Sequence, residues 1–178
     1  MLPVDKIVIF GTIRAADEVA RLGVARSLQV IGVRRGGRPE RGGEPWVEGV
    51  EWIDAGPGDV EAFGEAIAGA TAVVFMADEG LPQTMQAARE AGAKLVYAGR
   101  GDVGPEAVSG DVVVARPGPI DDAEVSPAEL EHVAEQTDVM RVERLAMALL
   151  RAALEDDVVG VLDRAALMEL GDAVMLQS

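Results

Sequence analysis

Three charged residues stand just after short apolar runs of this sequence, and their types suit acid–base chemistry. They are Asp78, Arg100 and Arg116. A carboxylate beside apolar walls can act as a general acid or base, and an arginine can hold a developing anion. Such a set would serve an isomerase, lyase or cyclase that needs no redox cofactor. The alternative is that they are ordinary caps and surface ion pairs, which is the commoner role of charged residues at strand ends.

A second group of candidates surrounds the stretch KIVIFGTIRAADEVARLG, which begins as a dinucleotide-binding turn does. An apolar strand leads to Gly11, and a helix follows, but the next two glycines of the phosphate-binding fingerprint are missing. If this turn still holds a dinucleotide, Gly11, Thr12 and Arg14 would contact it. Ala77, after a later apolar run, would line the same site.

The expected second strand ends in a pair of arginines, Arg34 and Arg35. At this place an NAD-binding chain carries an acid, whereas an arginine suits the 2′-phosphate of NADP. Arg38 and Arg41 follow, so the loop is a local basic patch on an acidic chain. The cofactor expectation is therefore none or NADP. A solvated loop with scattered charges is the alternative.

Composition excludes several classes of function. The chain has 178 residues, and its 31 acidic and 16 basic residues give a net charge of -15, which repels nucleic acids and anionic membranes. There is no cysteine and only one histidine, so we expect no thiolate chemistry and no metal site. No apolar run is long enough to span a bilayer, and the first ten residues are too short an apolar run for a signal peptide. We expect a cytoplasmic protein with a small-molecule ligand.

The elements that must position these residues alternate between short apolar runs and amphipathic segments. This alternation predicts βαβ units and an α/β fold, a doubly wound, mostly parallel sheet in a single domain. Strands are expected at Lys6–Phe10, Leu28–Val33, Val50–Ile53, Ala72–Phe75, Lys94–Tyr97 and Val112–Ala115, and helices at Ala15–Ala25, Val60–Ala68 and Leu81–Ala91.

Residues 119–178 differ in sequence pattern from the preceding part of the chain, and we expect them to form a C-terminal packing segment of the same domain. An acidic stretch leads to a helix at Val142–Leu154, where Leu145, Leu149 and two alanines share one side. That apolar side could pack on the sheet or pair with a second copy, so a homodimer is possible.

Several segments, in this order and spacing, resemble those of the atypical short-chain dehydrogenase/reductase proteins, the NmrA-like, NAD(P)H-binding group. After the opening strand and Gly11 they are GVEWIDAGPGDVEAF, AIAGATAVVFMA, AAREAGAKLVYAG, VVVARPGPI and RVERLAMALLRAALED. The resemblance implies a Rossmann-like fold and a divergent, shortened member of the group.

The group's cofactor contacts are poorly matched. Its glycines are spaced GxxGxxG, so Arg14 and Asp17 stand at the second and third positions. A side chain at position 14 obstructs the close approach of the pyrophosphate. A carboxylate at position 17 competes with phosphate for the positive end of the helix dipole, or simply stabilises the first helical turn. The acid that contacts adenine in the group is replaced by Ala55 and Gly56.

The group's catalytic serine, tyrosine and lysine are also missing. Tyr97 is the one tyrosine, and Lys6 and Lys94 are the lysines, so no lysine follows the tyrosine by four residues. Gly99 and Arg100 stand where the serine is expected.

Three hypotheses remain, in order of preference. The first is a cofactor-independent small-molecule enzyme or binder on a degenerate dinucleotide site. The second is an NADP-dependent reductase or NADP sensor. The third is a non-catalytic interaction subunit. Fold analogy alone does not choose among them.

Overall fold

Seven parallel strands form the centre of the computed structural model, which describes residues 5–11, 14–34, 49–56, 59–77, 80–99, 112–116, 120–121 and 140–175. The strand order is β3-β2-β1-β4-β5-β6-β9, so the chain winds outward in both directions from β1 and β4. This is the classic order of dinucleotide-binding folds, extended by one strand. The strands are β1 (Lys6–Phe10), β2 (Gln29–Arg34), β3 (Val50–Asp54), β4 (Ala72–Phe75), β5 (Lys94–Ala98), β6 (Val112–Ala115) and β9 (Gly160–Leu162).

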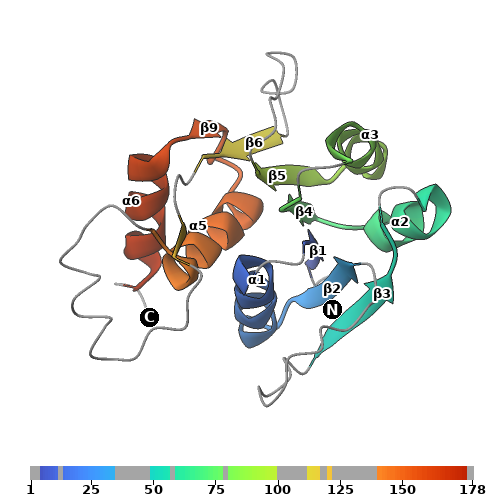
Figure 1. The fold of residues 1–178 in the computed structure, drawn as a ribbon, viewed down its shortest axis with the longest axis horizontal. Coiled ribbons are helices and arrows are strands. Elements are labelled where there is room, and N and C mark those ends of the chain that lie inside the picture. The colour runs from blue at the N-terminus through green and yellow to red at the C-terminus, as the bar shows by residue number, and fades with distance from the viewer. Residues whose placement is uncertain are drawn as a thin grey trace.

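Helices cover both faces of this sheet (Figure 1). On one face lie α1 (Arg14–Ala25), α5 (Val142–Leu154) and α6 (Arg164–Met175), and on the other lie α2 (Val60–Ile67) and α3 (Leu81–Ala91). A separate two-stranded pair joins β7 (Ile120–Asp121) to β8 (Met140–Arg141).

The strands are apolar on both sides because both sides are covered. In β1, Ile7 and Ile9 belong to the core under α1 and α5, whereas Val8 and Phe10 belong to the core under α2 and α3. Side chains alternate along a strand, so a strand buried on both faces must be apolar at every position. The expected α/β, doubly wound fold is confirmed.

The expected elements match closely. β1, β4, β6, α3 and α5 have the bounds that the sequence predicted, and β2 lies one residue later than expected. β9 and α6 were not expected. The run that forms β9 is three residues long and starts with Gly160, so it lacks the length that marks a strand in sequence.

The apolar side of α5 is covered by the chain itself, which is one of the two roles expected for it, and the homodimer stays a prediction. Leu145, Ala146 and Leu149 are at most 1% exposed, in the core shared with α1, α6 and the sheet. An interaction subunit would therefore need another surface.

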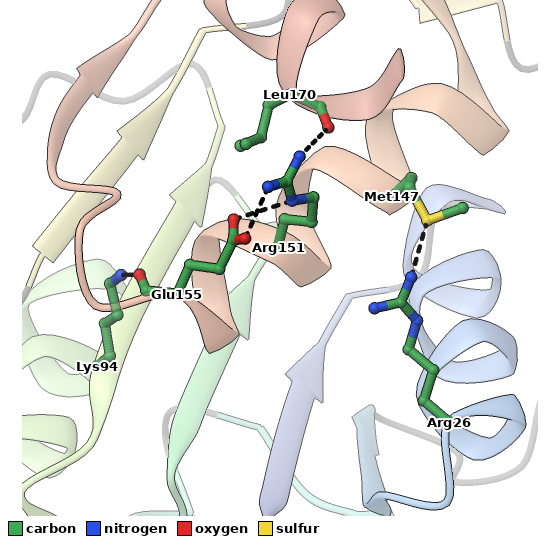
Figure 2. Close-up of polar contacts among 6 residues, drawn as sticks. All are labelled: Arg26, Lys94, Met147, Arg151, Glu155 and Leu170. Atoms are coloured by element: carbon green, nitrogen blue, oxygen red, sulfur yellow. Dashed lines mark hydrogen bonds and ion pairs between the residues drawn. The ribbon is translucent and has the colours of Figure 1, made fainter. Parts of the chain in front are cut away.

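Polar contacts join the C-terminal end of α5 to α6 and to the start of β5 (Figure 2). The Arg151 guanidinium binds the Glu155 carboxylate through Nε at 2.9 Å and Nη2 at 2.6 Å, and its Nη1 donates to the Leu170 carbonyl oxygen of α6 at 3.2 Å. Lys94 Nζ donates to the carbonyl oxygens of Glu155 at 2.6 Å and Val158 at 2.7 Å. The hydrogen bond to Glu155 raises the pKa of the Arg151 guanidinium, so the bridge keeps its cation.

Among the described helices, none is long and apolar enough to cross a membrane.

We predict that Arg151→Met lowers the free energy of unfolding by about 1–3 kcal/mol, because the Leu170 carbonyl and Glu155 lose their partner. Arg21→Met is the matched control. Arg21 is 53% exposed and pairs with Glu18 on the surface of α1, so its loss should cost no more than about 1 kcal/mol. Urea denaturation of the two variants measures both, and equal effects would contradict a structural role for the α5–α6 bridge.

Candidate functional site

The candidate site lies at the carboxyl ends of β1 and β4, where the winding of the sheet reverses. β1 pairs with β2 on one side and with β4 on the other. Crossover helices leave these two strands toward opposite faces, and open α/β sheets bind ligands at such a switch point. Gly11 follows β1, and Met76 and Ala77 follow β4.

Gly11 is required by close packing between the end of β1 and the end of β4. A Cβ at position 11 would lie 3.1 Å from the Met76 carbonyl oxygen and 3.4 Å from the Ala16 Cβ, and its φ of +158° disfavours other residues. The first glycine of the fingerprint is thus explained by the contact between the β1 turn and the end of β4. Ala77 is half-buried beside that contact.

Arg34 and Asp17 form a partly buried ion pair between the end of β2 and the first turn of α1. Arg34 Nη2 lies 2.5 Å from Asp17 Oδ1, and the two side chains are 7% and 15% exposed. The residue expected to read a 2′-phosphate is therefore already bound to the residue at the third glycine position. Neither role expected of Asp17, competition with phosphate for the helix dipole or stabilisation of the first turn of α1, anticipated this contact with Arg34.

Trp52 covers the same pair from the neighbouring strand β3. Gly32 and Trp52 are register partners, and a Cβ on Gly32 would lie 2.3 Å from the Trp52 ring, so the indole lies flat across the glycine. The Arg34 guanidinium carbon is 4.8 Å from the centre of that ring, a cation–π contact. Trp52 and Gly32 were not among the expected site residues. A glycine inside a strand is the sequence signal for such a close approach.

Arg116 lies at the end of β6, on the far side of the switch point from Arg34. Its Nη1 donates to the Gly99 carbonyl oxygen at 2.7 Å, and its guanidinium carbon is 6.0 Å from the centre of the Tyr97 ring. It therefore joins the ends of β5 and β6. β1, β4 and β5 separate it from Arg34, so the structure does not bring these two arginines together.

The other candidates fall in parts of the chain that the structure does not describe. Arg14 begins α1, but its side chain is not described. The remaining four, Thr12, Arg35, Asp78 and Arg100, lie outside the described residues.

The groups of the reductase triad are placed for structure rather than catalysis. Tyr97 is fully buried and stacks on Phe75, at 6.1 Å between ring centres. Lys6 and Lys94 start β1 and β5, at the amino edge of the sheet, where Lys6 Nζ donates to the Ala68 carbonyl oxygen at 2.7 Å. A tyrosine–lysine mechanism therefore has no lysine at the carboxyl edge.

Among the described residues, no cluster of three or more histidines, cysteines or carboxylates could hold a metal ion.

The fold resembles those of several solved structures at low sequence identity. A Rossmann-fold NAD(P)-binding family protein from Shigella flexneri has a TM-score of 0.67 at 13% identity, over 89% of this chain and 91% of that chain. The Bordetella bronchiseptica enzyme WbmH, solved in complex with NAD+, has 0.68 at 17% identity, over 97% and 81%. Thermus thermophilus UDP-glucose 4-epimerase, solved with NAD, has 0.63 at 15% identity, over 96% and 83%.

No family model and no curated protein matches the sequence. The structural likeness is therefore a likeness of fold. It confirms the Rossmann-like architecture and is consistent with the resemblance to a divergent, shortened dehydrogenase/reductase protein.

We predict that Gly99→Ala lowers the free energy of unfolding by about 1–3 kcal/mol, because the new Cβ would meet the Tyr97 hydroxyl at 2.5 Å. The same change at Gly64, inside α2 with nothing within 4 Å of a new Cβ, should raise stability by about 0.5–1 kcal/mol. Thermal unfolding of both variants checks the pair. Equal effects would show that Tyr97 does not fill the space beside Gly99.

Proposed function

We propose that this chain is a small-molecule enzyme or binding protein that acts at the carboxyl edge of its sheet without a dinucleotide. The observation that carries the proposal is the buried ion pair between Arg34 and Asp17. An adenosine ribose or its 2′-phosphate would need the end of β2, where the guanidinium is already bound and covered by Trp52.

The residues present do not fit a dinucleotide at this end. To bind a 2′-phosphate, Arg34 would have to leave Asp17, whose carboxylate would then lie beside the incoming phosphate. Separating a partly buried charge pair costs free energy, and phosphate contacts must offset that cost before any net binding appears. The missing adenine acid and the missing glycines add to the same conclusion.

The chemistry that remains at the edge is that of anion binding and proton transfer. Arg116 is fixed at the end of β6 by the Gly99 carbonyl, so its guanidinium has a defined place at the edge of the site. Arg100 would be a second cation and Asp78 the acid or base, and together they suit an isomerase, lyase or cyclase reaction on a small anionic molecule. The net charge of -15 repels an anionic ligand, so arginines at the site are needed to attract the ligand locally.

An NADP-dependent reductase or sensor is the second candidate. The solved proteins of this fold include complexes with NAD, and Arg34 stands at the position that suits a 2′-phosphate. This candidate requires the Arg34–Asp17 pair to open when the cofactor binds.

Calorimetric titration with NADPH, NADP, NADH and NAD at moderate salt separates the two candidates. We expect no binding of any of the four at micromolar concentrations, because the ribose-reading position is occupied. Micromolar binding of the phosphorylated pair, lost in Arg34→Ala, would favour the NADP candidate and overturn the proposal. Arg21→Ala is the matched control, since Arg21 is an exposed arginine of α1 that forms an ion pair with Glu18 of the same helix.

A further inference from the structure

The Arg34 guanidinium is buried, yet not all of its hydrogen-bond donors have a partner in the described part of the chain. The side chain is 7% exposed, and its Nε has no hydrogen-bond partner in the described part of the chain. Its Nη2 binds Asp17, and the Trp52 ring covers the guanidinium at 4.8 Å. A buried cation needs a compensating anion, and here Asp17 supplies one from within the chain.

This pairing joins two positions that serve a nucleotide in other chains of the fold. The third fingerprint position carries glycine there, which leaves room at the start of the helix, and the end of the second strand carries the group that reads the ribose. In this chain the two positions carry a carboxylate and a guanidinium that satisfy one another. The internal carboxylate takes the place of an external anion.

We propose that Asp17 is a specificity-determining residue, which excludes 2′-phosphorylated adenosine nucleotides by occupying Arg34. The proposal rests on the proposed function, in which the native chain binds no dinucleotide. A phosphate at this place competes with a carboxylate that is held by the chain and therefore pays no entropy of association. It would also be repelled by that carboxylate once displaced. Removing the Asp17 charge leaves the guanidinium without an anion and opens the position to phosphate.

The test compares adenosine 2′,5′-bisphosphate with adenosine 5′-monophosphate, which lacks the 2′-phosphate. Binding is measured by calorimetry and by the shift in unfolding temperature of the native chain, Asp17→Asn and Asp17→Ala. We expect no detectable binding to the native chain. Both variants should bind the bisphosphate at least about tenfold more tightly than the monophosphate, the scale of one hydrogen bond to a charged group.

The double variant Asp17→Asn with Arg34→Met is the control. It removes both buried charges, which a buried site tolerates better than the loss of one, and it should lose the gain in bisphosphate affinity. A gain that persists in the double variant, or no gain in either single variant, would overturn the proposal. Single variants that fail to fold even with the bisphosphate present would also overturn it, because the carboxylate would then serve the fold alone.

The two proposals fail in different ways. Dinucleotide binding by the native chain contradicts the proposed function, whatever the variants do. A native chain that binds none, with variants that also bind no bisphosphate, leaves the proposed function standing and removes the role of Asp17 in exclusion.

Discussion

The ion pair between Arg34 and Asp17 is the central interaction at the carboxyl edge of this sheet. It links β2 to the first turn of α1, and Trp52 on β3 covers it from the side. Three elements of the nucleotide half of the fold are thus tied together by protein groups at a place where related folds leave room for a cofactor. Such a charge pair is costly to separate, because the Arg34 guanidinium, 7% exposed, would lose its bound carboxylate.

The two edges of the sheet use their charged residues differently. At the amino edge, Lys6 donates to the Ala68 carbonyl oxygen after α2, and Lys94 donates to the carbonyl oxygens of Glu155 and Val158 after α5. At the carboxyl edge, Arg34 binds a carboxylate and Arg116 binds the Gly99 carbonyl. Both lysines lie at the amino edge, whereas a reductase would need its lysine at the carboxyl edge.

Most of the fold could be predicted from the sequence, because each central strand is a nearly unbroken apolar run and α1, α2, α3 and α5 repeat their apolar residues at helical spacing. β9 was not predicted because a strand of three residues is too short to show an alternating or continuous apolar pattern. The site was harder, because side-chain partners depend on register. The pairing of Gly32 with Trp52 and of Arg34 with Asp17 follows from how β2, β3 and α1 are stacked, which spacing along the chain does not reveal. From the sequence, Asp17 and Arg34 were each assigned a role separately, and the ion pair between them bears on both assignments.

The most direct measurement is the coupling free energy between Asp17 and Arg34, from a double-mutant cycle of unfolding with Asp17→Asn, Arg34→Met and the double variant. If the two side chains form a buried pair in solution, the cycle should give a favourable coupling of about 1–3 kcal/mol. Additive effects, within about 0.5 kcal/mol, would mean that the two residues do not meet, and the end of β2 would again be open to a nucleotide.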